Sequence, residues 1–207
     1  MRTEIEGKPS FAYLHVDLEP GESVVGESDA MASMDADLDM KAGFNGGFFS
    51  GLCKKFLGGE SLFINTFINN TNETKRVTLV QGTPGDMQKL ELNGGSYCLQ
   101  PGAYISSTPD INLGVKWAGI GSFIGREGLF KLHVSGQGTV WFGAYGGLIE
   151  KEVDGEFIVD TSHLVGYEPQ MQLKTQLAGG IFSSFFSGEG LVTRVVGKGK
   201  IVIQTRS

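Results

Sequence analysis

The chain has 207 residues, of which 32 are glycine, 40% are hydrophobic and only 19% are charged. This hydrophobic content is sufficient for a core and excludes a chain that is disordered throughout. The formal net charge of −6 argues against nucleic acid as the main partner, because phosphate binding normally requires a basic face.

No apolar run of about 18 residues is present, so we expect no transmembrane helix. The first residues lack the apolar core of a secretory signal and are too acidic for a transit peptide. The two cysteines, Cys53 and Cys98, are therefore expected to be reduced thiols, and the protein is expected in the cytoplasm.

Abundant glycine together with Val, Ile, Phe and Thr predicts an all-β fold with many tight turns. Residues 29–59 form the one long stretch without β character, and they allow a short helical turn. The predicted strands, in chain order, are 11–18, 76–80, 87–92, 139–142, 148–153 and 200–204.

Three sequence signatures recur along the chain in the same order, which indicates a threefold internal repeat. The first is a Gly/Glu box whose glutamates, Glu60, Glu127 and Glu189, are 67 and 62 residues apart. The second is a predicted turn that falls in successive copies at Gly21, Gly94 and Gly155. The third is a turn rich in Gly or Asn, placed after the strand that follows each box, at 69–72, 136–138 and 197–199.

The repeat is cut inside one copy, so both ends of the chain are needed to complete it. We therefore expect one compact body over 1–207, with three β-sandwich-like units in a pseudo-threefold ring. The N- and C-terminal strands are expected to lie in the same unit. The predicted units are approximately 11–40 together with 185–207, then 41–110, and finally 111–184.

The chain resembles a known family through three motifs: Gly59–Phe63, Val159–Val165 and Gly188–Val192. This is the family that includes the mitochondrial biogenesis protein named for altered inheritance of mitochondria. The resemblance covers about Tyr13 to Gln204 and implies three units with the fold of the tryptophan RNA-binding attenuation protein. It implies no catalytic residues, and fold alone does not supply a function.

The candidate partner-binding residues are aromatic side chains in three glycine-rich segments, called here the Gly/Phe segments. Large rings are unfavourable in exposed loops, so we expect them to bury against something. A plug at the pseudo-threefold axis, a self-association surface, and a ligand pocket or membrane-surface contact all remain open. The residues are Phe44, Phe48, Phe49, Phe56, Trp117, Phe123, Phe182, Phe185 and Phe186.

The repeated glutamates Glu60, Glu127 and Glu189 have two interpretations. Each carboxylate can accept backbone N–H bonds in a tight glycine turn, or the three can form a ring that binds a cation or a basic partner. The sequence does not indicate whether they converge.

Other reactive side chains give weaker signals. The three histidines lack metal-ligand spacing, so no metal and no cofactor is expected. Asp35, Asp37 and Asp39 alternate along one side of an extended segment, which favours a solvated face, with a weak cation site as the alternative. Cys53 has two adjacent lysines that could lower its thiol pKa, so a reactive thiol stays open there.

These features favour a non-enzymatic scaffold or binding protein that forms homo-oligomers through the Gly/Phe segments. The partner, a protein or a small molecule, is not identified by the sequence. The alternatives are a small-molecule-binding β-protein with a pocket between repeats, or a metal-dependent enzyme.

Overall fold

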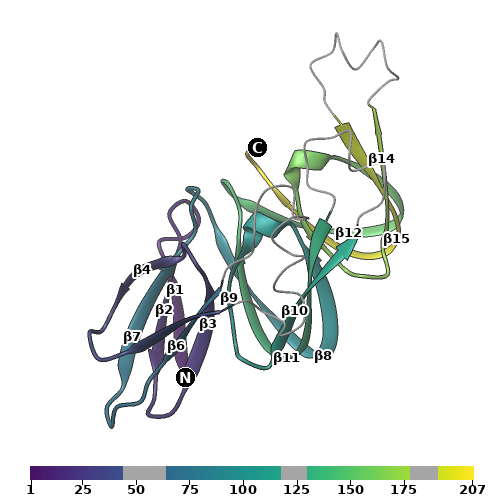
Figure 1. The fold of residues 1–207 in the computed structure, drawn as a ribbon. Helices are drawn as coiled ribbons and strands as arrows, with labels where there is room; N and C mark the ends of the chain where they lie inside the picture. The colour runs from purple at the N-terminus through teal and green to yellow at the C-terminus, as the bar shows by residue number, and fades with distance from the viewer. Residues whose placement is uncertain (44–63, 118–129, 178–190) are drawn as a thin grey trace.

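The computed structural model describes residues 1–43, 64–117, 130–177 and 191–207 (Figure 1). The described regular structure is all β apart from two short 3-10 turns, and every strand pair is antiparallel. No helix in this part of the chain is long and apolar enough to cross a membrane.

The strands fall into three groups that follow one another in sequence and across the view in Figure 1. The N-terminal group contains β1 (Arg2–Glu6), β2 (Tyr13–Leu18), β3 (Ser23–Glu27), β4 (Met31–Met34), β5 (Asp39–Gly43), β6 (Ile64–Ile68) and β7 (Lys75–Val80). The middle group contains β8 (Met87–Leu99), η1 (Pro101–Ala103), β9 (Tyr104–Ser107), β10 (Ile111–Trp117) and β11 (Phe130–Gly143). The C-terminal group contains β12 (Leu148–Asp160), η3 (Thr161–His163), β13 (Leu164–Tyr167), β14 (Gln172–Leu177) and β15 (Leu191–Gln204).

Two sheets hold these strands together. One has four strands in the order β1-β2-β7-β4. The larger sheet runs through all three groups in the order β12-β15-β13-β8-β11-β9-β3-β6-β5, with β10 added to β11 and β14 added to β15. The groups are therefore connected by hydrogen-bonded strands as well as by the chain.

Apolar side chains form three core clusters, and neighbouring groups share them. The N-terminal core includes Met87, Ile105 and Trp141, which come from the middle group. The middle core in turn includes Ile64 from the N-terminal group, with Val165 and Val202 from the C-terminal group. A smaller core fills the C-terminal group and includes Val153, Leu164, Val195 and Ile201.

The N- and C-terminal strands do not lie in one unit, so that prediction is wrong. β2 is flanked by β1 and β7, and β15 is flanked by β12 on one edge and by β13 and β14 on the other. Val16 belongs to the N-terminal core and Val202 to the middle core. Because nearby strands already pair with both edges of β2 and β15, neither strand has an edge left for the other.

Several strands were not predicted from the sequence, and three of them lie in two largely exposed segments. The polar residues Arg2–Glu6 form β1, which completes the edge beside β2. Met31–Met34 and Asp39–Gly43 form β4 and β5 in place of the helical turn that seemed allowed there. All three strands are largely exposed, so their sequences lack the alternating apolar pattern of a half-buried strand.

The two connections between groups are bound to each other. Asp86 N–H donates to Gly146 O at 2.8 Å, and Ala144 N–H donates to Asp86 O at 3.0 Å. Gly146 N–H donates to Pro84 O at 2.9 Å. A Cβ on Gly85 would lie 1.8 Å from Ala144 O, so only glycine permits this approach.

Candidate functional site

Nearly all the side chains that the sequence analysis selected lie outside the described residues. These are Phe44, Phe48, Phe49, Phe56, Phe123, Phe182, Phe185 and Phe186, with Glu60, Glu127 and Glu189. Trp117 ends β10, where its backbone pairs with Phe130. The described strands place each Gly/Phe segment between two antiparallel partners: β5 and β6, β10 and β11, and β14 and β15. The alternatives given for the Gly/Phe segments and for the repeated glutamates therefore fall outside the described residues.

The histidines are far apart in the fold and have separate partners. His15 Nδ1 lies 2.9 Å from Thr78 Oγ1, and His163 Nδ1 lies 2.6 Å from Gln204 O. Among the described residues, no cluster of three His, Cys, Asp or Glu side chains could hold a metal ion.

The acidic series in the N-terminal group also consists of separately bound carboxylates. Asp35 accepts from Arg76 N–H at 2.7 Å, Asp37 lies 3.3 Å from Lys75 Nζ, and Asp39 accepts from Asn70 Nδ2 at 2.6 Å. These bonds hold the β4–β5 turn against neighbouring strands and give each carboxylate a different donor.

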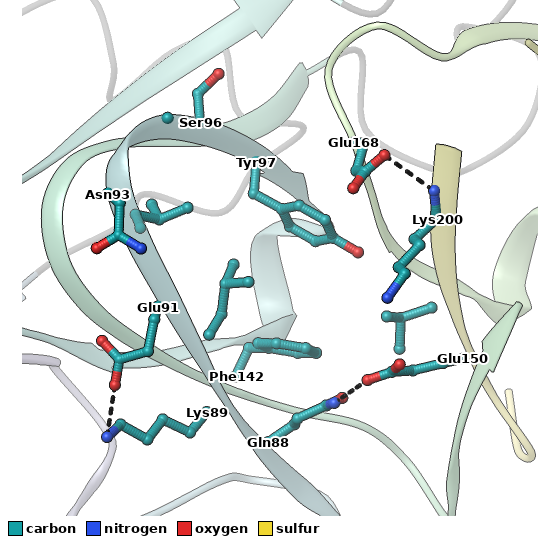
Figure 2. A pocket seen from close by; sticks show the side chains of 14 residues that line it. Gln88, Lys89, Glu91, Asn93, Ser96, Tyr97, Phe142, Glu150, Glu168 and Lys200 are labelled. Atoms are coloured by element: carbon teal, nitrogen blue, oxygen red, sulfur yellow. Dashed lines mark hydrogen bonds and ion pairs between the residues drawn. The ribbon is translucent and has the colours of Figure 1, made fainter. Parts of the chain in front are cut away.

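A cleft of about 500 Å³ lies where the middle group meets the C-terminal group (Figure 2). Strand β8 supplies most of its lining, because this strand runs along the cleft for most of its length. The remaining lining residues are Phe142 from β11, Glu150 from β12, Glu168 from the turn after β13, and Lys200 and Val202 from β15.

Apolar and aromatic side chains form one side of the cleft. The rings of Tyr97 and Phe142 are stacked with centroids 6.5 Å apart. Leu92 and Val202 are buried beside them, and Leu90 is half-buried. Burial raises the pKa of Tyr97 well above its ordinary value, so its hydroxyl keeps its proton at neutral pH. Figure 2 shows this hydroxyl directed into the cleft.

Polar side chains surround this apolar surface. Lys89 Nζ lies 2.5 Å from Glu91 Oε1, and Thr139 Oγ1 donates to Glu91 Oε2 at 2.8 Å. The hydrogen bond from Lys89 is the largest cause that lowers the pKa of Glu91, so this carboxylate is charged at neutral pH. On the far side, the backbone N–H of Lys200 donates to Glu168 Oε2 at 3.1 Å.

One acceptor in the cleft wall has no partner among the described residues. Gln88 Nε2 donates to Glu150 Oε1, whereas Gln88 Oε1 is buried without a hydrogen bond. A buried acceptor without a donor costs free energy, and because protein atoms enclose this oxygen, a ligand reaches it only if the Gln88 side chain moves. The carboxylates of Glu91, Glu150 and Glu168 also line the cleft, so it can hold a small molecule that pairs an apolar part with hydrogen-bond donors.

Sequence reasoning anticipated a pocket between repeats as an alternative, but it selected none of these residues. They come from strands of two different groups and carry no common motif. The alternating leucines at 90 and 92, followed by Tyr97, were the available signal. By themselves they indicate only a half-buried strand.

The fold defines an all-β protein whose strand groups are joined edge to edge, with a cleft between the middle and C-terminal groups. The chain belongs to the AIM24 family, described as mitochondrial biogenesis AIM24, whose sequence model matches residues 3–206. An uncharacterised protein of Streptococcus pyogenes serotype M6 is 27% identical over 214 residues, which cover 99% of this chain and 86% of that protein. A crystal structure of a Streptococcus pyogenes protein is similar with a TM-score of 0.79 and 26% identity, over 100% of this chain and 94% of that one.

Proposed function

We propose that this chain is a non-enzymatic binding and scaffold protein, built from three copies of one β-unit, that holds a small molecule in the cleft between its second and third copies. In this proposal, each of the three strand groups is one copy, and each copy is continuous in sequence; this is called below the three-copy part of the proposal. We also propose that each copy has the fold of the tryptophan RNA-binding attenuation protein.

Matching irregularities in the three groups support the three-copy part. In each group, a short strand skips one residue in its register with the last strand. The skips lie between Met31 and Ser33, between Tyr104 and Ser106, and between Leu164 and Gly166. Each short strand is followed by the same turn: Leu38 N–H bonds to Asp35 O, Ile111 N–H to Thr108 O, and Met171 N–H to Glu168 O. A bulge and a turn at matching positions are unlikely to arise three times independently.

The mixed lining of the cleft is the observation that carries the ligand-binding part. The stacked rings of Tyr97 and Phe142 lie in the cleft together with carboxylate side chains, so a bound molecule can cover apolar surface and donate hydrogen bonds at the same time. Three glutamates and two lysines line the same cleft, which favours a ligand rich in hydrogen-bond donors over an anion.

Native mass spectrometry of protein purified from its own cells tests this part. We expect a retained small molecule in the wild-type protein and its loss in Leu90→Trp, since the indole would occupy the cleft. Ile149→Trp is the matched control, because Ile149 is an exposed β12 residue that does not line the cleft. A wild-type protein with no bound molecule, or equal retention by Leu90→Trp, would remove the ligand-binding function.

Self-association is the scaffold part of the proposal. It is supported by the aromatic content of the Gly/Phe segments, which is unfavourable for loops in contact with water alone. Light scattering of the wild-type protein and of a Phe48→Ser/Phe49→Ser variant measures it. Loss of assembly with an unchanged circular dichroism spectrum is expected if this segment is the contact.

A further inference from the structure

The three groups are joined by one kind of contact used twice. At the first joint, β3 pairs with β9, with Val25 opposite Ser107 and Gly26 opposite Ser106. At the second joint, β8 pairs with β13, with Cys98 opposite Tyr167 and Leu99 opposite Gly166. In both joints, a strand of one group pairs antiparallel with the short bulged strand of the next group: β3 with β9, and the end of β8 with β13.

The register places Ile158 and Val159 of β12 where Cys98 and Leu99 lie in β8. Cys98 and Leu99 are the last residues of β8 before the N-cap of η1, and Ile158 and Val159 stand in the same place before η3. The preceding cross-strand pairs agree, because Tyr97 opposite Val134 corresponds to Phe157 opposite Val195. Among the described residues, β12 pairs with β15 alone, so its other edge has no strand beside it.

Ser33 and Met34 of β4 hold the matching places at the other end of the molecule. The bulge aligns Ser33 with Ser106 and Gly166, the residues that follow the skipped position in β9 and β13. In the described part of the chain, β4 pairs with β7 alone. One half of the joint is thus present at each end of the chain without its counterpart.

Side-chain exposure differs between residues inside the two joints and the residues at the same positions of β12 and β4, each of which has only one partner strand among the described residues. Cys98 is 3% exposed inside the second joint, whereas Ile158 is 52% exposed. On the opposite side, Tyr104 and Leu164 are 1% and 2% exposed, whereas Met31 at the same position in β4 is 37% exposed. In the first joint Val25, which holds the place of Cys98, is half-buried. The two ends of the molecule therefore present apolar side chains at positions that are buried or half-buried where a neighbouring group is present.

A side-chain hydrogen bond of the first joint can also be repeated. Ser106 Oγ donates to the carbonyl of Val25 at 2.7 Å across that joint. Ser33 supplies the same hydroxyl in β4, and Ile158 supplies the carbonyl in the place of Val25. Both the backbone pairing and this bond are available to a second copy.

We propose that a second copy of this chain docks head to tail, with Ile158–Val159 of one copy paired antiparallel to Ser33–Met34 of the next. The proposal rests on the three-copy part of the proposed function and replaces the Gly/Phe segments with a defined strand edge as the self-association contact. The contact is heterologous, because the two copies use different surfaces. Repeated addition produces a closed ring or an open filament.

Sedimentation velocity over a wide range of protein concentration tests the contact with two variants. Ile158→Lys places a charge on the β12 edge, and Ser33→Lys places one on the β4 edge; both sites are exposed in the single chain, so the fold should tolerate them. We expect the wild-type sedimentation coefficient to rise with concentration and each variant alone to remain monomeric. An equimolar mixture of the two variants should form dimers and nothing larger, because one intact half of each kind remains.

Ile149→Lys is the matched control, since Ile149 is 48% exposed on the same strand but lies outside the joint, and it should associate like the wild type. A monomeric wild type at every concentration would overturn the proposal together with the scaffold part of the function. Association that persists in Ile158→Lys but is lost in Phe48→Ser/Phe49→Ser would overturn the strand-edge contact and leave the Gly/Phe contact standing. A variant mixture that remains monomeric would overturn the head-to-tail arrangement, and circular dichroism of each variant verifies that it is folded.

Discussion

At the scale of single residues, the most constrained charge is the carboxylate of Asp17. It lies on the central strand β2, opposite Arg2 on one side and Arg76 on the other. Arg76 Nε donates to Asp17 Oδ1 at 2.6 Å, and Arg2 Nη2 donates to Asp17 Oδ2 at 2.8 Å. The hydrogen bond from Arg76 is the largest cause that lowers the pKa of Asp17 to about 2.

Asp17→Asn is therefore expected to lower the free energy of unfolding at neutral pH by about 1–2 kcal/mol. A carboxylate with a depressed pKa contributes stability above its unfolded pKa, and this contribution is lost as the pH falls from about 4 to about 2. The difference between wild type and variant should shrink over that range. Urea denaturation at pH 7, 4 and 2 measures it.

Asp37→Asn is the control, because Asp37 forms an exposed ion pair with Lys75. Exposed pairs contribute little to stability, so this variant should unfold like the wild type. A difference for Asp17→Asn that stays constant down to pH 2 would show that the carboxylate acts through something other than its charge.

The sequence was informative about some single residues and silent about others. All three predicted turn glycines have positive φ values, 82° at Gly21, 80° at Gly94 and 108° at Gly155. Gly21 lies in a turn as predicted, but Gly94 and Gly155 lie inside the long strands β8 and β12, so the prediction of a turn at those two residues is wrong. Gln88 and Ile158 could not be selected, because an unpaired amide and an uncovered isoleucine are defined by their surroundings. Neither residue type in that strand pattern indicates a binding function.

At the scale of elements, the joint between β8 and β13 depends on Gly166. A Cβ on this residue would lie 2.7 Å from Tyr97 Cε1 and 3.1 Å from Cys98 O. Because Gly166 has no side chain, β13 lies close to β8, and no larger residue fits there without moving one of the two strands.

Gly166→Ala is expected to lower the free energy of unfolding by about 1–3 kcal/mol through this overpacking. Gly114→Ala is the matched strand control, since a Cβ on Gly114 would meet only His133 O at 3.7 Å, an ordinary contact. Urea denaturation of both variants compares them. Equal stability of the two would mean that the joint is loose enough to absorb a methyl group.

The sequence predicted several long inner strands, but it missed the exposed edge strands and also the short buried strands β9 and β13. The predicted strand 76–80 lies within β7, and 87–92 and 148–153 form the first parts of β8 and β12. The exposed strands β1, β4 and β5 were missed because they exist through backbone pairing with inner strands. An edge strand needs only a partner, and local sequence does not encode that partner.

At the scale of the whole molecule, the shared cores couple the three groups. Trp141 belongs to the middle group but is buried in the N-terminal core, and Val202 belongs to the C-terminal group but is buried in the middle core. Loss of one group would therefore expose apolar surface on the next.

We expect denaturant to unfold the chain in a single transition for this reason. In a Trp117→Phe background, Trp141 becomes the one tryptophan, and its fluorescence reports on the contact between the N-terminal and middle groups. Its unfolding curve should coincide with the curve from far-ultraviolet circular dichroism, which reports on all strands. Two separated midpoints would show that the groups unfold independently.

The arrangement of the groups was the least predictable level. The sequence signatures correctly indicated an all-β chain, but the cut in the repeat suggested an exchange of strands between the two ends. That inference assumed that one copy is split between the two ends of the chain, with residues 11–40 and 185–207 completing each other. Pairing of β7 with β2 inside the N-terminal group satisfies the same sequence pattern locally, and local pairing requires less loop-closure entropy than joining the two ends.

The hydrogen bonds between the two inter-group connections have a practical consequence for anyone who wishes to modify this protein. Surface loops usually tolerate peptide tags and sensor insertions. Lengthening the Gly82–Asp86 connection would displace the Ala144–Gly147 connection as well, since three backbone bonds join them. Grafting is better directed to an exposed turn such as the one at Asn72, which connects β6 to β7 outside the sheet ladders.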